Sequence, residues 1–285
     1  FPLLKHNMYD ELWRNKKMGW SQSQIKSFEK DGYLFIPDLF TEDEIEVLRS
    51  DLPRIFSLDR DEIERDADTN EPRLALAMHK YSKIFDIMLR HPRLLNPAQQ
   101  ILGGEVYCHQ YKVVTKEPFG QLTFPWHQDF ASWSAHDGMP EPRAMNFAVF
   151  LDDVTEFNGP ITFIPGSHLQ GKLGSAAQTL PGITPLYTMG SDLVSELISE
   201  NGIVAPKGKA GAAVFFHSCL AHTSSPNISP WPRNIVYLTC NRTDNCIRKP
   251  TRPYYYADTD FSPLSALSDD CLTNIIYSTK TYAQN

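Results

Sequence analysis

The residues best suited to chemistry lie in the run Pro125-Trp126-His127-Gln128-Asp129-Phe130, where a histidine and a carboxylate stand two positions apart. In an extended segment, side chains two positions apart point to the same face. His127 and Asp129 would then converge on one point and supply two of the three ligands of a 2-His-1-carboxylate iron site. The pair alone is a weak signal, so the remaining ligand must be sought elsewhere in the chain.

A third ligand is expected near the end of a later apolar run, where folding can bring it beside the first pair. The run 212–216 leads into two candidates, His217 and His222. Arg233 follows them after a proline-rich turn and opens the next apolar run. A buried guanidinium facing the same cavity would hold a carboxylate through two hydrogen bonds, which favours a dicarboxylic co-substrate.

Charge and composition narrow the classes of partner. The 285-residue chain has a net charge of −7, which argues against nucleic acid because phosphate binding needs clustered Lys and Arg. No apolar run approaches the roughly 20 residues that span a bilayer, and no signal peptide pattern opens the chain. We therefore expect a cytoplasmic protein with a small-molecule substrate and no membrane partner, of undetermined oligomeric state. The five cysteines show no C-x-x-C spacing, which argues against a zinc ribbon or redox pair.

Two capping boxes organise the start of the chain, Ser21-Gln22-Ser23-Gln24 and Thr41-Glu42-Asp43-Glu44. In each, a hydroxyl residue precedes Gln or Glu by three positions, which is typical of a helix N-terminus. They predict one helix that ends near Gly32 and a second that ends before Pro53. The apolar run 33–37 between them predicts a short strand.

The next segment divides into a charged stretch and a helical one. Residues 56–75 are charged and poor in apolar side chains, and they predict a mobile loop. The window 84–101 predicts a helix that is interrupted at Pro92 and Pro97 and that stops at Gly103.

Beyond Val106 the pattern changes to short β-branched and aromatic runs separated by Pro, Gly and Asn. In the run 144–151, Asn146 and Ala148 share one face and larger apolar side chains share the other. The apolar face should pack in the core, and the Asn146 face can line a cavity.

These patterns predict a mainly β fold with flanking helices. Residues 1–20 are interpreted as an N-terminal extension and residues 21–285 as a single domain. Residues 169–201 form a long polar segment without a clear period, and we expect it to be a lid or insertion over a site.

With these residues in view, the chain resembles the phytanoyl-CoA dioxygenase-like (PhyH) family of Fe(II)/2-oxoglutarate-dependent oxygenases. His127-x-Asp129, His222 and Arg233 match the family pattern, including the eleven-position step from the second histidine to the arginine. Phe157-Asn158-Gly159-Pro160 and Ile164-Pro165-Gly166-Ser167-His168 support the resemblance. The arginine spacing favours His222 over His217 as the third ligand.

Two subgroups of the family share further motifs with the chain. Ectoine hydroxylases have a similar Trp133 and Asp137-Gly138-Met139-Pro140. Bacterial L-proline trans-4-hydroxylases resemble it at Val106-Tyr107 and Asn241-Arg242-Thr243-Asp244-Asn245. The resemblance favours hydroxylation of an unactivated C–H bond in a small amino-acid-like substrate, proline or a homologue, for natural-product biosynthesis. The alternative is desaturation, epoxidation or ring formation on a larger alkaloid, terpenoid or peptide scaffold.

The resemblance implies a jelly roll, or double-stranded β-helix, in which His127, Asp129 and His222 hold Fe(II). 2-Oxoglutarate would bind the metal with its far carboxylate on Arg233, and O2 would bind beside it. Asp129 also separates the chain from related halogenases, which lack this carboxylate so that chloride can bind.

Other positions carry over one by one. Gln110 matches a position near 2-oxoglutarate, and Ser224 matches one beside its far carboxylate. Trp133 matches an aromatic residue near the pocket, and we expect it and Asn146 to contact substrate. The chain departs from both subgroups at Val114, where they have Asn, so one detail of co-substrate or substrate binding stays open.

Two other classes of protein can be weighed against this hypothesis. A zinc hydrolase could use the same three ligands with a metal-bound water, but it leaves Arg233 without a role and lacks an evident general base. A non-enzymatic jelly roll that has lost its metal is disfavoured by the complete ligand set.

Overall fold

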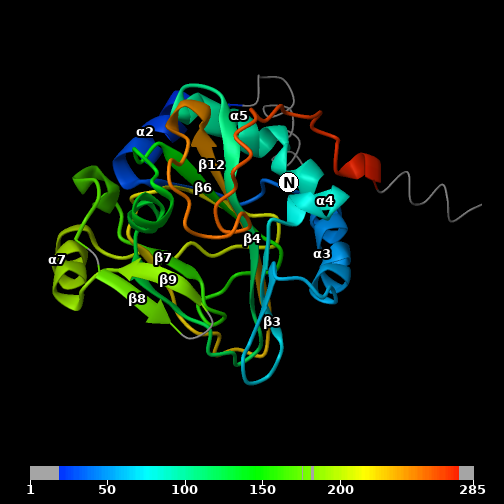
Figure 1. Cartoon of the computed structure of the whole chain (residues 1–285), viewed down its shortest axis with the longest axis horizontal. Coiled ribbons are helices and arrows are strands. Elements are labelled where there is room, and N and C mark those ends of the chain that lie inside the picture. Colours follow the sequence, from blue (N-terminus) through cyan, green and yellow to red (C-terminus); the bar gives the residue numbers. More distant parts are fainter. Residues whose placement is uncertain (1–18, 175, 181–182, 276–285) are drawn as a thin grey trace, which may run out of the picture.

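The computed structural model describes residues 19–174, 176–180 and 183–275, which build two antiparallel sheets with helices packed mainly against one of them (Figure 1). The major sheet has seven strands in the order β1-β10-β6-β12-β4-β3-β2, and the minor sheet has five in the order β7-β11-β5-β9-β8. The strands of both sheets pair in antiparallel fashion, and in the centre of each sheet the neighbours are not consecutive in the chain. This arrangement confirms the predicted jelly roll with flanking helices.

The strand bounds follow the two sheets. The major sheet contains β1 (Tyr33–Ile36), β2 (Ile63–Arg65), β3 (Pro72–Leu76), β4 (Val106–Lys116), β6 (Ala144–Phe150), β10 (Ala213–His217) and β12 (Arg233–Arg242). The minor sheet contains β5 (Phe124–His127), β7 (Ile161–Phe163), β8 (Ala176–Leu180), β9 (Ile183–Thr188) and β11 (His222–Ser224).

The α-helices are α2 (Gln22–Asp31), α3 (Glu42–Phe56), α4 (Lys83–Leu89), α5 (Pro92–Leu102), α6 (Asp129–Ser132) and α7 (Ser191–Asn201). Short turns of other helical types are η1 (Met78–Lys80), the π turn η2 (Trp133–Asp137), η3 (Ser167–Gln170) and η4 (Thr243–Asn245). Among the described ranges, none of these helices has the length and apolar character that crossing a membrane requires.

Strand β6 shows how the sequence alternation builds the core. Met145, Phe147 and Val149 pack in the large cluster that joins the major sheet to α2–α5. Ala148 and Phe150 point the other way, into the smaller cluster between the two sheets. The predicted alternation over 144–151 is therefore confirmed.

Both predicted capping boxes are present, with the Ser21 and Thr41 hydroxyls accepting the backbone N–H three residues on. Helix α2 ends at Gly32, whose φ of +79° favours glycine. Helix α3 does not end before Pro53 as predicted but continues to Phe56. Its last turn is held by the burial of Ile55 in the core, and a proline removes only one backbone donor there.

Residues 56–75 contain a β-hairpin, so the prediction of a loop was wrong. Ile63 of β2 pairs with Ala75 of β3, and β3 in turn pairs with β4, so the hairpin adds two strands to one side of the major sheet and β2 becomes its edge. The charged residues of this segment shape the turn, where Asp66 accepts two backbone N–H groups and is paired with Arg73. Charge here marks a turn and an edge rather than disorder.

The prediction for 84–101 is partly confirmed. Pro92 begins α5 at its first position and separates it from α4, and α5 ends at Gly103. Pro97 was expected to interrupt the helix, but α5 continues through it. Leu94, Leu95 and Ala98 on either side are fully buried, and this packing outweighs the lost hydrogen bond.

The predicted lid segment, 169–201, carries β8, β9 and α7 and extends the minor sheet, as Figure 1 shows beside α7. Thr188 of β9 pairs with His127 of β5. The segment is therefore built into the sheet that carries the predicted ligands, and its action as a lid stays a prediction. The predicted extension 1–20 lies, except for its last two residues, outside the described residues.

Candidate metal centre

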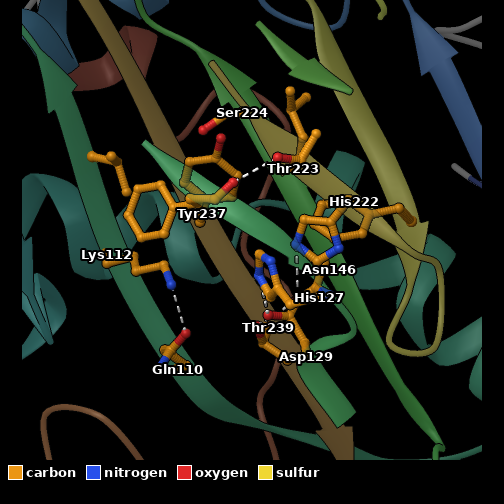
Figure 2. A pocket seen from close by; sticks show the side chains of 14 residues that line it. Gln110, Lys112, His127, Asp129, Asn146, His222, Thr223, Ser224, Tyr237 and Thr239 are labelled. Atoms are coloured by element: carbon orange, nitrogen blue, oxygen red, sulfur yellow. Dashed lines mark hydrogen bonds and ion pairs between the residues drawn. The ribbon is translucent and has the colours of Figure 1, made fainter. Parts of the chain in front are cut away.

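The two predicted histidine ligands face each other across paired strands. His127 is the last residue of β5 and His222 the first of β11, and the two are direct partners in the register of the minor sheet. Their ring centroids lie 4.0 Å apart. Asp129 follows where the chain turns into α6, and its carboxylate lies 3.6 Å from His127 Nε2 and 3.7 Å from His222 Nε2. Figure 2 shows these three side chains converging.

Backbone carbonyls set the orientation of both rings. His127 Nδ1 lies 2.7 Å from the Pro125 carbonyl oxygen, and His222 Nδ1 lies 2.9 Å from that of Leu220. A carbonyl only accepts, so each Nδ1 carries its proton and each Nε2 offers a lone pair toward Asp129. One ligand atom from each residue lies within 4.8 Å of the others. This set fits a metal that takes two imidazoles and one carboxylate, as non-haem Fe(II) does.

The charge state of the trio also suits a cation. Burial alone would raise the pKa of Asp129, but the neighbouring His222 and His127 and the charge of Lys112 bring it below its ordinary value. Burial, followed by the neighbouring His127, lowers the pKa of His222 to about 4. The site thus presents an ionised carboxylate and a neutral His222 imidazole at neutral pH, which are the forms that bind metal.

Two linked hydrogen bonds from residues of the major sheet hold the carboxylate of Asp129. Asn146 Nδ2 on β6 donates to Asp129 Oδ2 over 2.8 Å, and Thr239 on β12 donates to Asn146 Oδ1 over 2.6 Å. Such outer contacts orient metal ligands. Asn146 lines the cavity as predicted, while the contact it makes is with the ligand Asp129; its predicted contact with substrate stays a prediction.

His217, the alternative third ligand, lies elsewhere. It ends β10, its Nδ1 accepts the backbone N–H of Cys219 over 3.0 Å, and its ring packs 5.2 Å from His168. Neither residue lines the cavity at the trio.

Two chambers open beside the trio and share Gln110, Lys112, Phe124, His127 and Asp129. The first chamber lies between the sheets and adds Val114, Asn146, Ile161, Phe216, His222, Thr223, Ser224, Tyr237 and Thr239. The second chamber adds Glu64, Leu74, Ser132, Trp133, Leu186, Arg252 and Tyr256.

Arg233 stands behind the first chamber as a buried cation. It begins β12, is fully buried, and donates from one Nη to the Tyr237 hydroxyl over 3.3 Å. Its Nε and second Nη have no hydrogen-bond partner in the described part of the chain. Buried donors left unpaired are costly, and a carboxylate would satisfy both. This guanidinium therefore fits the far carboxylate of 2-oxoglutarate.

A buried lysine beside the first chamber was not predicted. Lys116 on β4 pairs in register with Arg233, and its Nζ donates to Ser224 Oγ over 2.9 Å and to the Ser225 carbonyl. Burial and then the charge of Arg233 lower the pKa of Lys116 to about 6. The sequence pattern that could have identified Lys116 is the alternation of β4, which places Gln110 and Lys116 on one face of the strand.

The remaining predicted positions divide between the chambers. Gln110 borders both chambers, donates to the Tyr256 carbonyl over 2.8 Å and accepts from Lys112 over 3.0 Å. Ser224 borders the first chamber and Trp133 the second. Val114, where the subgroups have Asn, packs in an apolar cluster with Leu74, Leu76 and Leu122.

A second trio with metal-binding residue types, His79, Cys108 and Asp258, also lies within 4.8 Å. Asp258 is already paired, with Lys80 Nζ at 3.0 Å and His79 Nε2 at 3.1 Å. Burial raises the pKa of the Cys108 thiol well above its ordinary value. We interpret this trio as an ion-pair cluster that fastens the C-terminal segment to η1.

Comparison with known proteins leads to the same class of enzyme as the geometry of the site. A sequence profile of the phytanoyl-CoA dioxygenase (PhyH) family matches residues 28–235. The ectoine dioxygenase of Bordetella parapertussis is 36% identical over 246 residues, which cover 81% of this chain and 78% of the relative. The L-proline trans-4-hydroxylase of Streptomyces griseoviridis is 33% identical over 257 residues, covering 86% and 95%.

Solved structures give the same grouping. The crystal structure of EctD from S. alaskensis with 2-oxoglutarate and 5-hydroxyectoine superposes with a TM-score of 0.77 at 32% identity, over 87% of each chain. The carbocyclase SnoK matches at a TM-score of 0.66 and 20% identity, which speaks for the fold alone. The chain belongs to the phytanoyl-CoA dioxygenase family and is a non-haem iron, 2-oxoglutarate-dependent dioxygenase.

Proposed function

We propose that this enzyme hydroxylates an unactivated C–H bond of a small amino-acid-like substrate, with proline or a homologue favoured, in natural-product biosynthesis. The observation that carries the proposal is the complete trio His127, Asp129 and His222 beside a chamber backed by Arg233, whose guanidinium has two nitrogen atoms without a partner in the described residues. The relatives named ectoine dioxygenase and L-proline trans-4-hydroxylase support a substrate of this size.

When bound, Fe(II) and 2-oxoglutarate supply the oxidant, because oxidative decarboxylation to succinate and CO2 puts one oxygen atom of O2 into succinate and one into the substrate. The residues of this chain hold and orient the reactants. His127, Asp129 and His222 would hold the metal, and Asn146 keeps the carboxylate in place. Arg233 would bind the far carboxylate of the co-substrate.

We assign the two chambers to the two organic reactants. The first chamber suits 2-oxoglutarate because the buried guanidinium of Arg233 stands behind it with two unpaired nitrogen atoms, and the Lys116 amine donates to Ser224 at its wall. Ile161 and Phe216 add apolar surface to the same chamber. The second chamber suits the substrate because it also reaches His127 and Asp129 and is walled by Trp133.

The proposal extends to the segments around the second chamber. Leu186 of β9 lines it, which supports a lid role for 169–201 over bound substrate. Arg252 and Tyr256, from the segment after β12, line it as well. Residues 21–285 would therefore act as one domain.

The proposal is tested with protein loaded anaerobically with Fe(II) and 2-oxoglutarate, then exposed to O2 with each free amino acid and the ring homologues of proline. The expected result is a product heavier by one oxygen atom, formed together with succinate in equal amount. Succinate without any oxygenated amino acid across the whole set would overturn the amino-acid proposal and favour the larger-scaffold alternative.

A further inference from the structure

The second chamber contains a carboxylate without a partner. Glu64 of β2 lines the chamber, and its side chain makes no hydrogen bond or ion pair within the described ranges. Two other buried carboxylates of this region are engaged: Glu62 with Arg60 and the Tyr254 hydroxyl, and Asp137 with Arg252. A part-buried, unpaired carboxylate in a cavity beside a metal centre is a candidate for binding a ligand.

The hairpin aims Glu64 at this position. Ile63 packs in the main core, so the alternation of β2 turns the Glu64 side chain the other way, toward the chamber. Glu64 pairs in register with Leu74, which lines the chamber too. Burial raises the pKa of Glu64 to about 7, and the positive charges of Lys112 and Arg73 act against that rise.

A cation faces the same chamber. Lys112 of β4 donates one hydrogen bond, to Gln110, and no carboxylate of the described residues lies within 4.0 Å of its Nζ. Lys112 and Glu64 influence each other electrostatically without forming an ion pair, so space remains between them. The other chamber cation, Arg252, is committed through Nε and one Nη to Asp137.

We propose that Glu64 accepts the protonated amine of the substrate and that Lys112 binds its carboxylate, so that the second chamber selects zwitterionic amino acids. This inference rests on the proposed function and names the residues that define its substrate class. An ammonium group beside Glu64 stabilises the ionised carboxylate that burial disfavours. The substrate carboxylate supplies the anionic acceptor that Lys112 lacks.

Binding measurements separate this inference from the proposed activity. Protein loaded anaerobically with Fe(II) and 2-oxoglutarate is titrated by calorimetry with the amino acids and with the 2-hydroxy acids of the same carbon skeletons. For proline, the matched compound is its ring-oxygen isostere, which has the carboxylate but no amine. The variants are Glu64→Gln, Lys112→Met and, as a control on the same hairpin, the exposed Glu71→Gln.

Glu64→Gln should weaken the binding of the amino acid that the wild type binds by about 10- to 100-fold, because a charge-assisted hydrogen bond is lost. The affinity for the matched hydroxy acid should stay unchanged. Lys112→Met should weaken both compounds, since both carry the carboxylate. Glu71→Gln should alter neither. Because the Glu64 carboxylate has no partner in the described residues, its replacement by Gln strands no other group, and Glu64→Asp serves as the conservative variant.

Equal binding of the amino acid by wild type and Glu64→Gln, or equal weakening of both compounds in that variant, would overturn the inference. So would a wild-type enzyme that binds the hydroxy acids as tightly as the amino acids, or that binds neither set. Turnover is scored separately from binding. Oxygenated product with no effect of Glu64→Gln leaves the proposed function standing and removes only the role of Glu64.

Discussion

The two chambers beside the metal centre are built from different parts of the chain. The first is lined by residues 110–239, and all of its described lining residues except Asp129 lie on strands of the two sheets. The second recruits Glu64 from an edge hairpin and Arg252 and Tyr256 from the segment beyond the profile. Strands of the two sheets therefore build the first chamber, while an edge hairpin and the segment after β12 complete the second.

The chambers also differ in charge. Among the described residues that line the first chamber, Asp129 is the only carboxylate, and behind its wall stand the guanidinium of Arg233 and the Lys116 amine, which can take up a proton. The second chamber sets Glu64 against Lys112, with Arg252 neutralised by its acidic partner. A surplus of positive charge suits a dianion, and a balanced pair suits a zwitterion.

The largest expected effect comes from the residues that both chambers share. His127→Ala or Asp129→Ala should abolish stoichiometric Fe(II) binding and reduce turnover by at least about 10³-fold, because two ligands do not complete the site. Anaerobic Fe(II) titration with succinate release measures both. The matched control is His217→Ala, which should keep its iron. Iron loss in that control, with retention in His127→Ala, would show that the ligands are misassigned.

Loss of the guanidinium should affect the first chamber alone. Arg233→Gln should raise KM for 2-oxoglutarate by about 10²-fold, because the far carboxylate of the co-substrate loses its buried guanidinium partner. The affinity for Fe(II) should stay unchanged. Steady-state kinetics at saturating substrate measure the change. A rise in the KM for the amino acid without one for 2-oxoglutarate would reverse the assignment of the two chambers.

Asn146 reaches Asp129 from the major sheet, so its substitution should change the binding of iron more than the binding of 2-oxoglutarate or substrate. Asn146→Ala should lower Fe(II) affinity by about 10- to 100-fold, because the ligating carboxylate loses the donor that orients it. Competition with a chelator of known affinity measures it. Thr239→Val, one step further along the hydrogen-bond chain, should have a smaller effect of the same sign.

The smallest effect is a change in protonation at the first chamber. With a pKa of about 6, Lys116 is largely neutral at pH 7, and a bound dianion nearby should raise that pKa. Binding then takes up a fraction of a proton, so 2-oxoglutarate affinity should increase as pH falls from about 8 toward 6. Calorimetry in buffers of different ionisation enthalpy measures the uptake. Lys116→Met should abolish it; uptake that persists in this variant would place the titrating group elsewhere.

Much of the site could be predicted because its signals are local. The two-residue step from His127 to Asp129 and the period-two alternation around Asn146 depend only on neighbouring residues. The errors arose where tertiary packing outweighed local propensity. Pro53 and Pro97 stay inside helices because buried neighbours hold those turns. The charged stretch 56–75 forms strands because β4 offers an edge to pair with.

By itself, the sequence determined the kind of chemistry, since the ligand types and the spacing of His222 to Arg233 are properties of the chain as written. Only the tertiary structure decided how those groups meet. The register that sets His127 opposite His222, and the packing that brings Glu64 and Lys112 to one chamber, join residues dozens of positions apart. Such contacts depend on which strand edges pair across the whole sheet, and no local pattern encodes that choice.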